Sequence, residues 1–146
     1  MIALKNISID ENINQLPKTI LEEERFAYFY NDNITQAYNQ SYLDVILIKN
    51  SYELKYKNMI IFSLNNFSSF NKKNSWKKGD ELLIKFAQNL ISNFNDDLIF
   101  RIFGDDFIII SSNNINLNYA KKSLDDLMNK NSMTYRVIQI DLTKNR

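Results

Sequence analysis

The sequence predicts an α+β fold of the palm or ferredoxin-like type, in which helices flank a central sheet that contains antiparallel strands. The first observation is the order of patterns. From residue 58, short apolar runs and helical stripes follow one another as β-α-α-β-β-α-β. The second is that two of the apolar runs are joined by a tight turn, which is typical of an antiparallel hairpin. The third is that helical segments connect this hairpin to the outer strands, as in a split β-α-β arrangement.

Composition allows one domain with a substantial core. The 146 residues are too few for two comfortable domains, and 45% apolar and 24% charged residues are ordinary for a globular protein. A net charge of +1 gives no long-range attraction for nucleic acid or an anionic membrane. The lack of Cys and His excludes disulfides, thiolate catalysis, the usual zinc sites and histidine acid–base chemistry. A metal ion would therefore be a hard cation such as magnesium, held by oxygen atoms.

The N-terminal segment lacks the features of a targeting sequence. It begins MIALKNISID, with an early acid and no long apolar stretch. No apolar run in the chain approaches the roughly 18 residues of a membrane span. We predict a soluble cytoplasmic domain at 18–146, preceded by a leader or linker at 1–17 that ends at the only proline, Pro17.

The first half of the domain is predicted to contain two helices and a strand. Residues 18–30 have helical apolar spacing and acids near their start, as the helix dipole favours. Residues 31–40 are turn-like, 41–56 form a second helical pattern, and NMIIFSL at 58–64 is a short apolar strand. The aromatic run FAYFY at 26–30 favours packing in the core over an amphipathic helix that signals to another domain.

The second half is predicted to place a helix on each side of the hairpin. The expected elements are, in order, a helical turn and loop at 65–78, a helix at 79–94, strands at 98–102 and 106–111, a helix at 116–130 and a strand at 133–142. Within the loop, KKNSWKK at 72–78 surrounds Trp76 with four lysines. A solvated loop is the favoured interpretation, and a phosphate- or partner-binding edge anchored by Trp76 is the alternative.

Two adjacent acids interrupt the most apolar stretch of the chain, RIFGDDFIII at 101–110. Asp105 and Asp106 follow Gly104 at the expected tip of the hairpin, where glycine permits a turn and carboxylates reach solvent. A plain structural turn explains this pattern. Carboxylates that face another acid at the end of the 58–64 strand would instead form a magnesium site for phosphoryl or nucleotidyl transfer. The residues alone leave both interpretations open.

Three segments resemble the motifs of one protein family. RIFGDDF at 101–107 is similar to R-x-G-G-[D/E]-E-F, the signature of GGDEF domains, the diguanylate cyclase family. NDNITQAYNQ at 31–40 resembles the family's D-x-L-T-G-L-x-N-R segment, and 66–87 resembles its F-K-x-x-N-D-x-x-G-H-x-x-G-D-x-x-L-x-x-x-A stretch in register. The resemblance extends from about residue 20 to residue 142. It implies a nucleotide-cyclase-type palm, and condensation of two GTP molecules into cyclic di-GMP by two domains that meet face to face.

The resemblance also implies roles for individual residues. Asp105 and Asp106 would be metal ligands, with Asp106 also catalytic in an active enzyme. Leu64 would offer its backbone carbonyl to the metal, and magnesium is expected only when nucleotide is bound. On the nucleotide side the implied residues are Asn71 and Asp80, for the guanine edge, and Leu83, beside the base.

The same comparison shows departures at the expected active site. The family's first metal-binding Asp falls on Ser63, which removes one negative charge from the metal cage. The first signature glycine is Phe103, whose side chain obstructs a close approach of the backbone to phosphate. Asp106 replaces a glutamate and shortens the reach of the carboxylate by one methylene. Further departures are Gln40 for an arginine, Ser75 for a glycine, Trp76 for a histidine and Phe94 for the arginine of the product-inhibition site.

These departures lead to our first hypothesis, a degenerate GGDEF module of a bacterial cyclic di-GMP signalling protein. It would be a non-catalytic regulatory or dimerisation domain that retains the possibility of binding GTP, beside other domains such as an EAL-type phosphodiesterase. The family's C-terminal helix, which carries cationic phosphate ligands, is not expected within residues 1–146, as in an excised fragment or an eroded family member. The alternatives are an active diguanylate cyclase with a relaxed site, and a palm-like interaction domain with no ligand. A homodimer is possible under the first two hypotheses.

Overall fold

The computed structural model describes residues 11–144. Its elements are α1 (Glu11–Tyr30), α2 (Gln40–Glu53), β1 (Asn58–Leu64), α3 (Phe67–Asn74), α4 (Trp76–Asn93), β2 (Leu98–Ile102), β3 (Asp106–Ser111), α5 (Asn118–Lys130) and β4 (Tyr135–Asp141). This order confirms the β-α-α-β-β-α-β pattern expected from residue 58. Residues 1–10 of the predicted leader lie outside the described residues, so the division into leader and domain stays a prediction.

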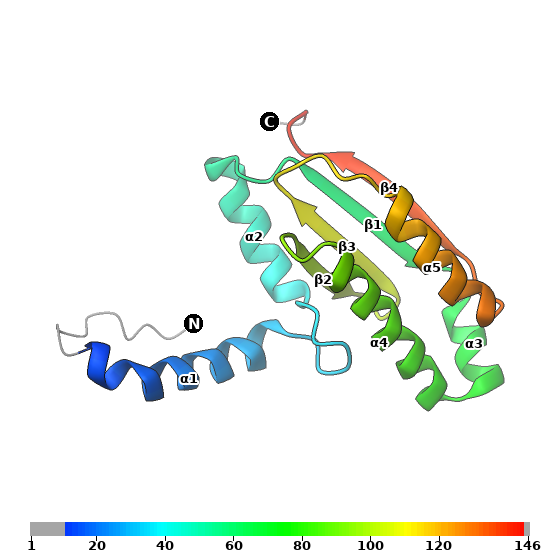
Figure 1. The fold of residues 1–146 in the computed structure, drawn as a ribbon, viewed down its shortest axis with the longest axis horizontal. Coiled ribbons are helices and arrows are strands. Elements are labelled where there is room, and N and C mark those ends of the chain that lie inside the picture. The colour runs from blue at the N-terminus through cyan, green and yellow to red at the C-terminus, as the bar shows by residue number, and fades with distance from the viewer. Residues whose placement is uncertain (1–10, 145–146) are drawn as a thin grey trace.

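The strands form one antiparallel sheet in the order β2-β3-β1-β4, as a ferredoxin-like topology requires. β1 is central, with β3 on one side and β4 on the other. Figure 1 shows α4 and α5 running across one face of this sheet, while α2 lies apart from them. The predicted fold class is confirmed.

Apolar side chains cover both faces of the sheet. On β1, Ile60 and Phe62 pack in the core shared with α3, α4 and α5, whereas Met59 and Ile61 belong to the core shared with α2. Successive side chains of a strand point to opposite faces, so a strand covered on both faces needs apolar residues throughout. This is why NMIIFSL is an almost uninterrupted apolar run.

Two helix boundaries differ from those predicted. α1 begins at Glu11 rather than at residue 18 and continues through Pro17. A proline removes one backbone hydrogen bond, but the turns on either side continue the helix, so the expected helix start at residue 18 is wrong. α2 ends at Glu53 rather than at residue 56, because Leu54 adopts a left-handed backbone with φ 56°. The side chain of Asn50 then holds the backbone N–H and C=O of Tyr56, which fixes the chain outside the helix.

The segment predicted as a helical turn and loop is mostly helical. α3 occupies its first half, and α4 begins at Trp76 instead of residue 79. Ser75 separates the two helices with φ 151° and ψ 162°, and its Oγ accepts a hydrogen bond from the backbone N–H of Lys78 at 3.2 Å. This serine caps α4, and the cap explains the earlier start. Trp76 is 75% exposed, in agreement with the solvated interpretation of this segment.

The aromatic run at the end of α1 divides between core and surface. Phe26 and Tyr30 pack against Tyr42, with ring centroids 5.1 and 5.2 Å away. Tyr28 and Phe29 are 79% and 54% exposed, so the prediction of core packing is wrong for these two residues. A helix that packs by one face alone buries only the positions on that face. No helix in the described range, α1 included, has the length and apolarity needed to cross a bilayer.

Candidate functional site

The hairpin between β2 and β3 carries the signature residues at its tip. Ile102 pairs with Asp106, and the turn consists of Phe103, Gly104 and Asp105. Phe103 and Gly104 both have left-handed backbones, with φ 54° and 86°. Gly104 adopts this conformation at no steric cost, whereas Phe103 pays about 1 kcal/mol or more in strain. Phe103 is nevertheless 80% exposed, so packing does not explain its position.

The sheet places the end of β1 beside the acid pair. Ser63 pairs with Asp106, and the backbone N–H of Leu64 donates to the carbonyl oxygen of Asp105 at 3.0 Å. The structure thus brings together the residues that the resemblance assigns to the metal. Burial and the neighbouring charge of Asp106 raise the pKa of Asp105, against the opposing effects of Arg101 and Arg136.

The residues at this point do not fit a tightly held magnesium ion. The anionic donors are two carboxylates that adjoin in sequence, and the residue across from Asp106 is Ser63, which offers a neutral hydroxyl. Magnesium is held mainly through carboxylates and phosphates in octahedral geometry. Among the side chains of residues 20–144, no group of three or more His, Cys, Asp or Glu is placed to hold a metal. The residue that pairs with Ser63 on its other side is Arg136, a cation.

Helices α3 and α4 bring Asn71 against Gly79. Asn71 is 7% exposed, and in the described part of the chain its Oδ1 is the only buried side-chain polar atom without a hydrogen-bond partner. A Cβ at position 79 would lie 1.7 Å from this oxygen, so glycine permits the close approach. Asp80 follows on α4 and is partly buried. The residues implied for the guanine edge therefore lie on facing helices.

Leu83, which is implied to lie beside the base, is a buried residue of α4. It is 1% exposed and belongs to the core between the sheet and the helices α3, α4 and α5. Its side chain stabilises the fold, and its place beside a base stays a prediction. Phe94, at the position of the product-inhibition arginine, is also core, with 9% exposure.

Sequence reasoning missed an ion pair that supports the hairpin. Both carboxylate oxygens of Asp32 accept from Nη1 of Arg101 at 3.0 Å, and Nε of Arg101 donates to the carbonyl oxygen of Gly104 at 2.8 Å. Thr35 donates to Asp32 through its backbone N–H and its hydroxyl, each at 2.8 Å. Burial raises the pKa of the Asp32 carboxyl, but the hydrogen bonds from Thr35 and Arg101 outweigh it and hold that pKa below its usual value. The sequence did contain a signal for this ion pair, because Asp32 and Arg101 each occupy a position of a family motif.

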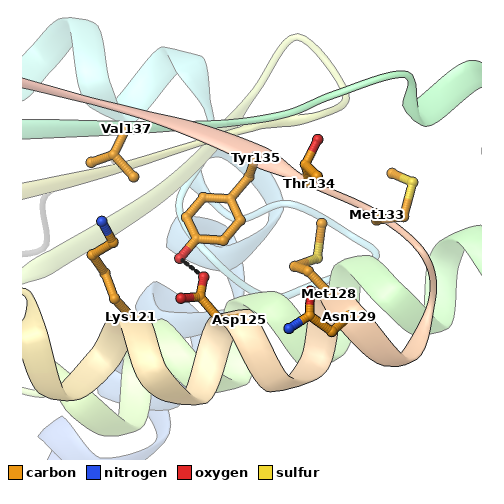
Figure 2. Close-up of a pocket in the computed structure, with 8 residues that line it drawn as sticks. All are labelled: Lys121, Asp125, Met128, Asn129, Met133, Thr134, Tyr135 and Val137. Carbon is orange, nitrogen blue, oxygen red and sulfur yellow. Dashed lines mark hydrogen bonds between the residues drawn. The ribbon is translucent and has the colours of Figure 1, made fainter.

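A separate hollow of about 370 Å³ lies between α5 and β4 (Figure 2). Tyr135 from β4 and Asp125 from α5 point toward one another across it, and the tyrosine hydroxyl donates to Asp125 Oδ1 at 2.7 Å. Burial and this hydrogen bond raise the pKa of Tyr135. The pair ties α5 to the edge strand, on the face of the sheet opposite to Arg136.

Solved structures share the fold at low sequence identity. The LapD S helix-GGDEF-EAL structure of Vibrio cholerae, bound to c-di-GMP, matches with a TM-score of 0.69 and 17% identity, over 87% of this chain and 32% of that chain. The diguanylate cyclase SiaD of Pseudomonas aeruginosa, in complex with its activator SiaC, matches with a TM-score of 0.65 and 16% identity, over 90% of this chain and 56% of that chain. This chain therefore spans about a third of the first and little more than half of the second.

A third structure, the GGDEF domain of DgcB from Caulobacter crescentus in complex with c-di-GMP, matches with a TM-score of 0.60 and 15% identity, over 75% of this chain and 73% of that chain. No curated protein matches the sequence significantly. The family model described as "Diguanylate cyclase, GGDEF domain" matches residues 29–144, which include the Asp32 segment, the Asn71 and Gly79 pair and the signature hairpin. The chain belongs to the GGDEF domain family.

Proposed function

We propose that this chain is a non-catalytic GGDEF module that binds GTP and acts as a regulatory or dimerisation domain in a bacterial, cytoplasmic cyclic di-GMP signalling protein. The proposed loss of catalysis is based on one observation, the pairing of Ser63 with Asp106. Nucleotidyl transfer requires cations that neutralise the triphosphate and activate the attacking hydroxyl. Because position 63 is a serine where a further carboxylate is needed, the site carries too little negative charge to hold these cations.

The turn itself adds a second obstacle. Phe103 stands at the tip of the hairpin with its side chain 80% exposed. A glycine there would let the backbone N–H groups approach a phosphate, whereas a phenyl ring occupies that space. Both changes act on the phosphate side of the site and leave the guanine side intact.

Guanine binding is supported by Oδ1 of Asn71, a buried acceptor that has no hydrogen-bond donor. A buried acceptor without a donor costs about 1 to 3 kcal/mol. A rotation of the Asn71 amide away from Gly79 would bring this oxygen to a ligand donor and recover that cost. The guanine edge presents N–H donors of this kind, and the carboxylate of Asp80 is a further acceptor on the facing helix. A GTP molecule held mainly through its base would therefore be bound without being turned over.

The partners proposed for the module follow from what its relatives contain. LapD joins a GGDEF to an EAL domain, and SiaD is a cyclase bound to an activator protein. We propose by analogy that this chain works beside an EAL-type domain or a second GGDEF domain, as a regulatory input. These are proposals drawn from fold-level similarity.

Calorimetric titration with GTP, with and without magnesium, tests the nucleotide proposal. Asp80→Ala should abolish the binding heat because a guanine edge would be left unpaired, whereas Asp126→Ala, an exposed acid on α5, should not. Unchanged affinity in Asp80→Ala would contradict the binding pose. If the unaltered chain gives no binding heat with GTP, the remaining hypothesis is an interaction domain that binds no nucleotide.

A product assay at high protein concentration tests the loss of catalysis. The unaltered chain should form no cyclic di-GMP with GTP and magnesium. Magnesium-dependent product that disappears in Asp105→Ala would establish the alternative, an active diguanylate cyclase with a relaxed site, and would overturn the proposal.

A further inference from the structure

Three side chains form a row across the sheet at the end of β1. Ser63 pairs with Asp106 on β3 and, on its other side, with Arg136 on β4. Directly paired residues of neighbouring antiparallel strands project to the same face, with Cβ atoms roughly 4.5 to 5.5 Å apart. The row Asp106, Ser63, Arg136 therefore lies on one face of the sheet, in the order anion, hydroxyl, cation.

The serine leaves room for the arginine to reach the acid pair. Ser63 has the smallest side chain of the row and is only partly buried, while Arg136 is exposed and has a long, flexible stem. The charge of Arg136 also acts on Asp105, where it opposes burial and the charge of Asp106. Arg136 is thus electrostatically coupled to Asp105, although it lies on the far side of β1.

The other cation near the acids is already engaged. Arg101 donates to both oxygens of Asp32 and to the carbonyl of Gly104, and its pair with Asp32 is the only ion pair among the side chains described, those of residues 20–144. Arg101 therefore serves the structure of the hairpin. Arg136 remains as the cation that can neutralise Asp105 and Asp106.

We propose that Arg136 is the resident cation of this site, so that its guanidinium neutralises the acid pair across Ser63 and excludes divalent metal. The inference rests on the proposed function, a module without a magnesium cage. A divalent ion at Asp105 and Asp106 would lie near the permanent positive charge of Arg136, which lowers the affinity for the ion. It would also lack a carboxylate ligand at position 63. Arginine keeps its charge at all physiological pH values, so the exclusion does not depend on pH.

Titration with Mn²⁺ in the absence of nucleotide, followed by electron paramagnetic resonance and calorimetry, tests the inference. The unaltered chain should bind Mn²⁺ weakly, and Arg136→Ser should bind it about tenfold more tightly or better, because the competing charge is gone. Arg136→Lys keeps the charge and should remain as weak as the unaltered chain. Lys121→Ser is the matched control, since it removes one positive charge beside β4 on the opposite face of the sheet.

A second pair of variants restores the missing carboxylate. Ser63→Asp with Arg136→Ser should bind Mn²⁺ at least about tenfold more tightly than Ser63→Asp alone. Thermal unfolding of each variant verifies that the fold is retained. Equal affinities of Arg136→Ser and the unaltered chain, together with equal affinities in the Ser63→Asp pair, would overturn the inference.

The outcomes also separate this inference from the proposed function. Cyclic di-GMP formation by the unaltered chain would overturn the proposed function, whatever the metal titration shows. An inactive chain whose Arg136→Ser variant gains no Mn²⁺ affinity would overturn only the role of Arg136. Strong Mn²⁺ binding by the unaltered chain would contradict both the proposal that the site holds no divalent metal and the proposal that Arg136 excludes it.

Discussion

Asp32 and Arg101 are joined by a pair of hydrogen bonds, in which both carboxylate oxygens lie 3.0 Å from Nη1 of the arginine. The aspartate lies in the segment that follows α1, and the arginine lies in β2 directly before the signature turn. Arg101 also donates to the carbonyl oxygen of Gly104, so these side chains link the segment after α1 to the hairpin, in addition to the backbone hydrogen bonds that Tyr38 makes with Ile99 and Arg101. A displacement of α1 would therefore act on the position of the acid pair.

Asp32→Asn should lower the free energy of unfolding by about 2 kcal/mol near neutral pH, because it removes charge-assisted hydrogen bonds in a largely buried pair. Urea unfolding measures the loss. Asp44→Asn is the control, since Asp44 is exposed and accepts from Gln40 on the same helix, and its effect should stay within about 0.5 kcal/mol. Equal effects of the two substitutions would contradict a structural role for the ion pair.

The contribution of Asp32 should depend on pH in one direction. Its pKa is held below the usual value in the folded state, so the folded chain binds this proton less readily than the unfolded chain. The stabilisation is then complete above the unfolded pKa, about 3.9, and is lost as pH falls through the folded value. The difference between the unaltered chain and Asp32→Asn should be constant from about pH 7 to about pH 5 and should shrink below about pH 4. A difference that grows on acidification would contradict this assignment.

Gly79→Ala should destabilise the protein by about 1 to 2 kcal/mol, because the new Cβ would meet Asn71 Oδ1 at 1.7 Å. The side chain of Asn71 would have to move, and GTP binding should be lost with it. In an Asn71→Ala background the same change should be neutral or stabilising by up to about 1 kcal/mol, since alanine is the better helix former. Additive effects in this double-mutant cycle, measured by urea unfolding, would show that the clash is absent.

The hairpin tip offers a matched pair of backbone substitutions. Phe103→Gly should stabilise the protein by about 0.5 to 1 kcal/mol, because relief of the left-handed strain at φ 54° exceeds the added entropy of the unfolded chain. Gly104→Ala should destabilise by about 1 to 2 kcal/mol through backbone strain alone, since a Cβ there meets nothing within 4 Å. Thermal unfolding of both variants measures whether each substitution stabilises or destabilises the protein. A destabilised Phe103→Gly would show that the phenyl ring makes a stabilising contact.

Tyr135→Phe should reduce stability by about 1 kcal/mol through loss of the hydrogen bond to Asp125. The folded pKa of Tyr135 is raised, so this contribution is complete below the unfolded pKa, about 10, and is lost as pH rises through the folded value. Tyr119→Phe is the control, because Tyr119 is 80% exposed. A larger effect of Tyr119→Phe in urea unfolding would contradict a link between α5 and β4 through Tyr135.

Local patterns in the sequence determined much of the fold. The apolar run of β1, the stripe of α4 and the turn at Gly104 each depend on residues a few positions apart, and each element formed where its pattern lies. The family motifs also located the acid pair and the Asn71 segment, because motif spacing is a property of the linear chain. What local patterns missed were boundaries set by side-chain caps, such as Ser75 at the start of α4.

Tertiary structure alone decided which residues meet. Residue patterns along the chain predicted the class of fold, the order of its elements and the presence of two acids at a hairpin tip. They could not show that Arg101 reaches Asp32, that Asn71 lies on Gly79, or that Arg136 stands across Ser63 from Asp106. The relationships of Arg101 and Arg136 join segments distant in the chain, and that of Asn71 and Gly79 depends on how two consecutive helices pack. Strand register and helix packing arise from the summed burial of the whole core rather than from any local pattern.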